Sequence, residues 1–417
     1  MLTLVALAAV SAVSAFAQTA YQPSGINPNP AWGTGVSIIG AFDVGYGALN
    51  YKGNNKVSTV MHNGSTTSQI DFVGVMDLGG GTKADFFFEN DIIPTSYITN
   101  PGVGTLNGTY AAGAYQPNAG TPSSAQAVST WGNGQVKAGI GGSLGYLAVG
   151  APNHATLDFN QYTNPFGTSI GGGYGVTIAS IGYGSSAKVR FDNSARYLTP
   201  TVNGLTGSLT YRPKASAGNN SFVSTTPGLQ AQSGVQELGA IYGNGPVNAI
   251  FVSMVEDGNG INGADGVLVT SGSKKTTNSL GTNYTMGGTT LYAAYQNQKS
   301  DTTLNNKAYR YAVKYMLTPA FSLSGVYSYA NKGSNNTKTT LSAVGGEYAL
   351  SKTVAVYGKY ETVSDGAGLI SSVESNGGAD SALATPTTAN NAGFTSGTGT
   401  QPNITRTRAM VGLRVGF

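Results

Sequence analysis

The C-terminal end of the chain alternates strictly between two kinds of side chain. From Thr405 to Phe417, every second residue is Thr, Ala or a larger apolar residue. The residues between them include Arg406, Arg408 and Arg414. Because successive side chains of a β-strand point to opposite faces, this segment is predicted to form a strand with one apolar and one hydrophilic face. Such a strand has to lie between an apolar and an aqueous environment.

The same two-sided pattern recurs along the chain. In Lys307–Leu317, tyrosines and aliphatic residues alternate with Arg310, Ala312 and Lys314. The segments with this pattern are Val36–Gly47, Ser68–Asp77, Thr82–Glu89, Gln135–Gly142, Gly145–Gly150, Ser186–Leu198, Gly204–Tyr211, Gln236–Tyr242, Val247–Val255, Thr277–Met286, Thr289–Gln296, Lys307–Leu317, Phe321–Ala330, Thr339–Leu350, Thr353–Val363 and Ile404–Phe417. Their number, about sixteen, is even, as in bacterial membrane barrels.

The connections between these segments alternate in length. The short ones are Leu78–Gly81, Gly243–Pro246, Gly287-Gly288, Thr318–Ala320 and Ser351-Lys352, whereas the long ones lie between Ile92 and Gly134, between Ala151 and Ser185, and between Ser364 and Asn403. Short periplasmic turns that alternate with long external loops are typical of outer-membrane barrels. We therefore expect an all-β fold: a transmembrane antiparallel β-barrel of about 16 strands.

The composition narrows the class of protein further. Only 10% of the residues are charged, and the 24 tyrosines argue against an intrinsically disordered chain. The absence of cysteine excludes disulfides and thiolate metal sites. A net charge of +4 is too small at this length to indicate nucleic-acid binding. Beyond the N-terminus no long apolar run occurs, so a membrane-bound chain must cross the bilayer as strands.

The N-terminus resembles a secretory signal. An apolar run over Leu2–Val13 precedes the small-x-small sequence Ala15-Phe16-Ala17, although no basic residue follows Met1 directly. We expect a signal peptide at 1–17, an N-terminal extension at 18–34 and the barrel at 35–417.

Several motifs, in their order along the chain, resemble the trimeric general porins of β- and γ-proteobacteria. These are Gly40-Ala41-Phe42-Asp43-Val44-Gly45, Asp77-Leu78-Gly79-Gly80-Gly81, Asn193-Ser194-Ala195-Arg196-Tyr197 and Tyr348-Ala349-Leu350-Ser351-Lys352-Thr353. The resemblance implies a homotrimer in the outer-membrane lipid of a Gram-negative bacterium, with small hydrophilic solutes as its cargo. It also implies that Phe417 is read by the barrel-insertion machinery.

The resemblance further implies that the third external loop, Ala151–Ser185, folds into the pore. We expect His154, Asp158, Asn164 and Phe166 to belong to this constriction loop. The chain departs from the family where it has Gly150-Ala151 in place of Gly-Arg, and where Gln69 and Val73 occupy positions that are usually basic.

Strand alternation predicts which charged residues line the pore. The predicted acidic residues are Asp43, Asp71, Asp85 and Glu89, all on the first three strands; the predicted basic residues are Lys137, Lys188, Arg190, Arg196, Arg310, Lys314, Arg406 and Arg408 on later strands. Charges at mid-depth on the lipid face cost roughly 2–4 kcal/mol each, which favours the lumen. Since the basic residues are more numerous, we expect a weak preference for anions. An interfacial aromatic girdle is expected from Tyr197, Tyr211, Tyr284, Tyr292, Tyr315, Tyr348, Tyr357 and Phe417.

Motifs that suggest chemistry have simpler explanations. The G-x-S-x-G match at 141–145 precedes a second strand rather than a helix, so we expect a hairpin turn. The G-x-G-x-x-G match at 258–263 lacks a following helix, and its neighbours Glu256, Asp257 and Asp265 leave a calcium site as a minor alternative. His62 and His154 are expected in loops, too far apart to indicate zinc. We therefore expect no enzyme activity and no cofactor.

The function most compatible with these features is passive diffusion through a water-filled channel. A substrate-specific outer-membrane channel remains an alternative, because an inward loop and inward arginines also suit a stereospecific site. A secreted adhesin without a pore is the second alternative, but it would not require loops of alternating length or a terminal aromatic strand.

Overall fold

The computed structural model describes eleven segments of the chain. These are residues 34–51, 56–92, 134–167, 169–171, 190–191, 193–214, 234–258, 274–300, 305–332, 337–365 and 404–417. The signal peptide and all but the last residue of the N-terminal extension lie outside these residues, so both remain predictions.

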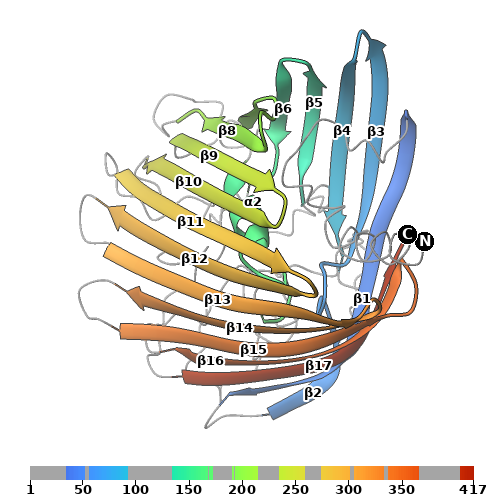
Figure 1. Ribbon diagram of the computed structural model, residues 1–417, viewed down its shortest axis with the longest axis vertical. Helices are drawn as coiled ribbons and strands as arrows, with labels where there is room; N and C mark the ends of the chain where they lie inside the picture. The colour runs from blue at the N-terminus through green and yellow to red at the C-terminus, as the bar shows by residue number, and fades with distance from the viewer. Residues whose placement is uncertain are drawn as a thin grey trace, which may run out of the picture.

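The described residues form one closed antiparallel sheet (Figure 1). Its strands are β1 (Gly35–Tyr51), β2 (Lys56–His62), β3 (Gln69–Gly79), β4 (Thr82–Asp91), β5 (Val136–Gly142), β6 (Gly145–Ala151), β7 (Ser194–Leu198), β8 (Leu205–Arg212), β9 (Gly234–Asn244), β10 (Val247–Asp257), β11 (Lys274–Met286), β12 (Thr289–Ser300), β13 (Asn305–Thr318), β14 (Phe321–Lys332), β15 (Thr337–Ala349), β16 (Val354–Asp365) and β17 (Ile404–Gly416). Pairing of β1 with β17, from Ala41↔Gly416 to Tyr51↔Arg406, closes the ring.

Two of these strands share one place in the barrel. β2 pairs with the later half of β1, and β3 pairs with its earlier half. Both are antiparallel to β1, so β2 and β3 run in the same direction. The ring therefore has sixteen strand positions, and the expected sixteen-stranded barrel is confirmed. The sequence prediction missed β2 and wrongly placed His62 in a loop, because the polar residues after His62 interrupt the alternating pattern.

Side chains alternate between the two faces of the wall as the period-2 pattern predicts. Outward positions carry large exposed apolar residues, such as Tyr311, Val313 and Leu317 on β13, whereas Arg310 on the same strand is buried. Two girdle predictions are wrong. Tyr357 points inward, where its hydroxyl donates to Asp43, and Tyr292 shares the inward face with Ala294. The position of each tyrosine in the alternation of its strand decides which face it lies on, whatever its aromatic character.

The connections differ in length at the two ends of the barrel. Short turns join β3 to β4, β5 to β6, β9 to β10, β11 to β12 and β13 to β14. Gly79, Gly80 and Gly81 all have positive φ, the left-handed region that favours glycine, in the first of these turns. The hairpin expected at the G-x-S-x-G match is present between β5 and β6.

The expected strand Ser186–Leu198 is wrong at its N-terminal end. β7 begins only at Ser194, after Asn193, whose φ of 55° interrupts an extended chain. Arg190 forms an isolated bridge with Asn153 instead of lying on a wall strand. Lys188 lies outside the described residues.

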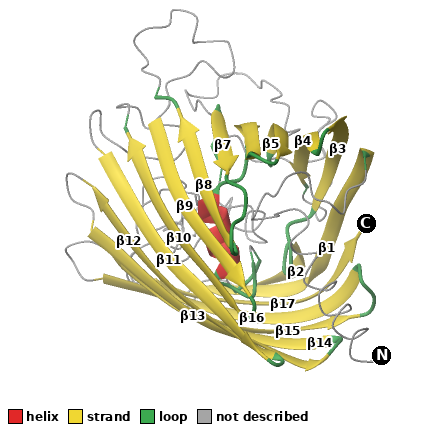
Figure 2. Cartoon of the chain, turned by 45° about the horizontal axis from the view of Figure 1, so that its top comes forward, coloured by secondary structure: helices red, strands yellow, loops and turns green. Residues whose placement is uncertain are grey.

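A single described helix, α2 (Ala155–Tyr162), interrupts the β-structure. It follows β6 and lies inside the ring of strands, against the wall (Figures 1 and 2). Within the described part of the chain, no helix has the length and apolarity needed to cross a bilayer. The residues that hold α2 in place define the site described below.

Candidate pore lining and inward loop

The described part of the connection between β6 and β7 includes residues 152–167 and 169–171 and, at its far end, Arg190 and Phe191. It runs along the inner wall of the barrel (Figure 2). We call residues 153–171 the inward loop. Its helix contacts β9, β10 and β11, and its later residues reach β14, β15 and β16. The loop is therefore held by strands that lie far from β6 in the sequence.

A wall carboxylate caps the N-terminus of α2. His154 is the N-cap residue but forms no side-chain cap of its own. Instead, Glu237 of β9 accepts hydrogen bonds from the backbone N–H of Ala155 at 2.8 Å and from the hydroxyl of Thr156 at 2.7 Å. Its Oε2 atom also lies 2.6 Å from Nδ1 of His154. Because the first N–H groups of a helix lack internal partners and favour a negative charge, Glu237 fixes the start of the helix.

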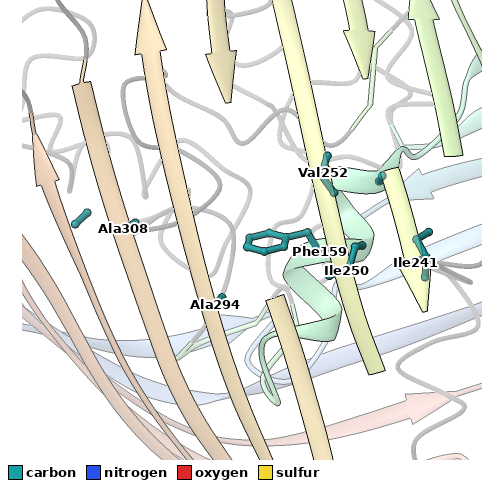
Figure 3. Close-up of a cluster of buried hydrophobic side chains, with 8 residues drawn as sticks. Phe159, Ile241, Ile250, Val252, Ala294 and Ala308 are labelled. Atoms are coloured by element: carbon teal, nitrogen blue, oxygen red, sulfur yellow. The ribbon is translucent and has the colours of Figure 1, made fainter. Parts of the chain in front are cut away.

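Apolar packing fixes the middle of α2. Phe159 is fully buried and forms one cluster with Ile250, Val252 and the small residues Ala294 and Ala308. Figure 3 shows its ring projecting from α2 on the side of Ala294 and Ala308. The alanines of β12 and β13 leave room for the ring against the wall. Truncation of a buried Phe costs about 3–5 kcal/mol in protein cores, so this contact is a main attachment of the helix.

The polar face of α2 is bound to two wall arginines. Arg196 of β7 donates to Asp158 at 2.5 Å and to the carbonyl of Asn153 at 2.8 Å. Arg310 of β13 donates to the side-chain oxygen of Asn160 at 2.8 Å. Burial raises the pKa of Asp158 to about 7, although the nearby Arg196 acts in the opposite direction. The pKa of the Asp158 carboxyl group is thus close to neutral pH.

The second half of the inward loop is attached to strands near the C-terminal end of the chain, β14, β15 and β16. The N–H of Phe166 donates to the side chain of Asn164 at 2.9 Å in a local turn. The Phe166 ring then packs on inward side chains of β14, β15 and β16. Lys359 donates to Ser169 at 2.7 Å, and Glu361 accepts from the backbone of Gly171 at 2.8 Å. Asn164 and Phe166 thus position the loop.

The acidic residues predicted on the first strands all face inward and are buried. Asp85 is paired with Lys137 of β5 at 2.6 Å. Glu89 lies 3.3 Å from Arg190, which brings β4 next to the start of the inward loop. Asp71 accepts from Gln69 at 2.5 Å, and the carboxylate of Asp43 accepts from backbone N–H groups described below.

The arginines of β17 form an inward cluster with neighbouring strands. Oε1 of Glu361 accepts from Arg406 at 2.6 Å and from Arg408 at 3.1 Å. Arg414 donates to Glu347 of β15 at 2.9 Å. One carboxylate oxygen of the described residues thus serves both Arg406 and Arg408.

Inward charged residues extend beyond the predicted sets. Inward acidic residues also occur on later strands, at Glu237, Glu256, Glu347 and Glu361, and further inward basic residues occur at Arg212, Lys275, Lys359 and Arg414. The same alternation that identified Arg310 and Lys314 would have found them, since each lies on the hydrophilic face of its strand. Lys314 itself is half-buried on the inward parity of β13.

Comparison with known proteins identifies the family. A model of the Gram-negative porin family matches residues 3–368, which is most of the chain. The chain belongs to the Gram-negative porin family. This porin therefore forms a channel for passive diffusion in the outer membrane, and family membership confirms the expectation of a channel rather than an enzyme. No curated protein matches its sequence.

Solved structures show the same fold as this porin. The anion-selective porin from Comamonas acidovorans is similar over 92% of this chain and 99% of its own, with 16% identity and a TM-score of 0.63. Over the same 92% of this chain, in-vitro folded OmpT of Vibrio cholerae in its trimer form (99% of that chain, 12% identity, TM-score 0.55) and Salmonella typhi OmpF in complex with daunomycin (97% of that chain, 13% identity, TM-score 0.54) are similar. At these identities the likeness shows the fold alone.

Proposed function

We propose that the narrow part of this channel is lined by the inward loop and the charged wall residues, and that it has a weak preference for anions. The observation that carries the proposal is the shared oxygen of Glu361. Two arginines, Arg406 and Arg408, converge on this carboxylate, which also accepts from Gly171 of the inward loop, so basic groups lie beside the loop. A fixed charge at a constriction selects ions of the opposite sign.

The numbers of acidic and basic residues on the whole described inward surface also favour a preference for anions. Its acidic residues are Asp43, Asp71, Asp85, Glu89, Asp158, Glu237, Glu256, Glu347 and Glu361; its basic residues are Lys137, Arg190, Arg196, Arg212, Lys275, Arg310, Lys314, Lys359, Arg406, Arg408 and Arg414. Basic residues are the larger group. Because most of them lie beside a carboxylate, the expected preference is weak. The anion-selective Comamonas porin is a fold relative only and does not determine the sign.

The test is a reversal potential in planar bilayers under a salt gradient. An anion-selective channel gives a potential of the sign set by chloride, and a cation-selective one gives the opposite sign, which would reject the proposed preference. The same bilayers distinguish a general pore from a substrate-specific channel. Conductance that saturates with one solute and is blocked by it would favour the specific channel.

We further propose that the porin is a homotrimer whose final residue is read by the barrel-insertion machinery. Phe417 stacks on Phe42 at 5.9 Å, and its backbone exchanges hydrogen bonds with Gly40, each at 3.1 Å. Phe417 thus completes the seam between the first and last strands while the residue stays about half exposed. Cross-linking of the folded protein tests the trimer, and the yield of heat-modifiable protein after removal of Phe417 tests the signal.

A further inference from the structure

The segment that runs from β2 through β3 contains more residues than the part of β1 with which it pairs. Val44 of β1 is paired with His62, and Ala41 is paired with Gln69. Two residues of β1, Phe42 and Asp43, therefore lie opposite six residues, 63–68. A continuous strand would need only two, so four residues are extra. We call residues 63–68 the inserted bulge, because an extra stretch in one strand of an antiparallel pair is a β-bulge.

The inserted bulge points into the barrel and not toward the lipid. Asn63, Gly64, Ser65 and Ser68 are buried although all are small or hydrophilic. Outward residues of the flanking strands, such as Val60 and Met76, are more than half exposed. A polar segment directed at lipid would leave its backbone groups without hydrogen-bond partners, so burial on the inner side has a clear physical cause.

Asp43 holds the inserted bulge in one conformation. Its Oδ2 atom accepts from the backbone N–H groups of Ser65 at 2.6 Å and Thr66 at 2.7 Å. The backbone of Asp43 is bonded to the hydroxyl of Ser68 at 3.0 Å and to the N–H of Asn63 at 3.2 Å. These hydrogen bonds give the inserted bulge a defined conformation.

The bulge reaches the same sector of wall as the end of the inward loop. The hydroxyl of Ser65 donates to Glu347 of β15 at 2.7 Å. A side chain at Gly64 would collide with Tyr357 of β16 and Met410 of β17. Ile170 of the inward loop packs in one cluster with Met61, Tyr357 and Met410. The two elements therefore meet against β16 and β17.

We propose that the inserted bulge is a second constriction element, which narrows the channel together with the inward loop and helps to set the largest solute that passes. Asp43 is its positioning residue. The width of the pore at this level depends on both elements, because the bulge occupies space inside the barrel that a continuous second strand would leave open. Thr66 and Thr67 are the half-buried members of the bulge, and Thr66 is the one of the two whose backbone N–H donates to the Asp43 carboxylate.

The absence of cysteine from the chain allows a direct test. Thr66→Cys places one thiol on the bulge while its backbone N–H still donates to Asp43. After treatment with a negatively charged methanethiosulfonate, we expect a partial loss of single-channel current. Val344→Cys, on the exposed outward face of β15, is the matched control and should show no loss. Unchanged current through Thr66→Cys channels, once mass spectrometry has shown complete modification, would overturn the proposal.

A deletion gives an independent measurement. Removal of residues 64–67 takes out the four extra residues and lets β2 continue into β3 along β1. The expected result is a higher single-channel conductance, and entry of larger sugars in a liposome-swelling assay. A deletion channel with unchanged conductance and size limit contradicts the proposal. Channel formation by the unmodified parent protein tests the porin function separately, so the two failures are distinguishable.

Discussion

Glu237 on β9 caps the helix that begins at Ala155, 82 residues earlier in the chain, with its Oε1 atom 2.8 Å from the Ala155 nitrogen. A helix normally carries its own cap in the preceding residue. Here the side chain of the preceding residue, His154, instead contacts the same carboxylate, with 2.6 Å between its Nδ1 atom and Oε2 of Glu237. The start of the inward loop therefore depends on the barrel wall, and each attachment of the loop gives a prediction about the channel.

Glu237→Ala should loosen the inward loop. The substitution leaves the buried donors of Ala155 and Thr156 without their acceptor, at a cost of about 1–3 kcal/mol for each unsatisfied group. We expect noisier open-channel current and a wider size limit, with Glu237→Gln intermediate because it keeps one oxygen acceptor. Single-channel recording measures both effects. Glu256→Gln is the control, since Glu256 is paired with Lys275 on the neighbouring strand; an equal increase in noise there would contradict the assignment.

Phe159→Ala should detach the middle of α2 from the wall. The lost packing against Ile250 and Val252 corresponds to about 3–5 kcal/mol in a well-packed core. The expected result is faster permeation of sugars near the size limit in liposome swelling. Phe86→Ala removes the same ring from the exposed outward face of β4 and should leave permeation unchanged.

Arg408→Gln should weaken the proposed anion preference. The substitution removes one positive charge from the wall, while Arg406 keeps its contact with Glu361 at 2.6 Å. Since two charges about 4 Å apart interact by about 1 kcal/mol in water, we expect the anion-to-cation permeability ratio to fall by up to about fivefold. Reversal potentials give this ratio. Lys338→Gln removes the same charge from an exposed outward position of β15, and a similar shift there would mean that only total charge matters.

Asp158 should make selectivity depend on pH. Burial raises its pKa from 3.8 to about 7, against the effect of Arg196, while Glu237 adds to the increase. Below pH 7 the carboxyl is neutral, so the inward loop loses one negative charge and the anion preference should rise as the pH falls. A folded-state pKa above the unfolded value also means that this group's contribution to stability falls as pH rises from about 4 to 7.

Reversal potentials between pH 5 and pH 9 in the wild-type channel and in Asp158→Asn test this dependence. The variant has no titrating group at this position, so its selectivity should lack the change near pH 7 and match the low-pH wild-type channel. The same midpoint in Asp158→Asn would assign the titration to another group.

Much of the lining followed from alternation. Alternation in the sequence places Asp43, Asp85, Arg310 and Arg408 on hydrophilic strand faces, and all four are inward and buried in the structure. Glu237 and Glu361 carry the same signal, since both lie on the inward faces of their strands. The inserted bulge gave no such signal, because a run of polar residues with no period is typical of a surface loop.

The sequence by itself determined a sixteen-position barrel with a known inside and outside, because period-2 alternation is a local property of each strand. It also determined where the long connections occur. Only the tertiary structure decided which wall residues hold those connections. Contacts such as Glu237 with Ala155 and Glu361 with Gly171 join residues 82 and 190 positions apart. No local pattern encodes such pairs, since they arise from closure of the sheet, which brings distant strands around one interior.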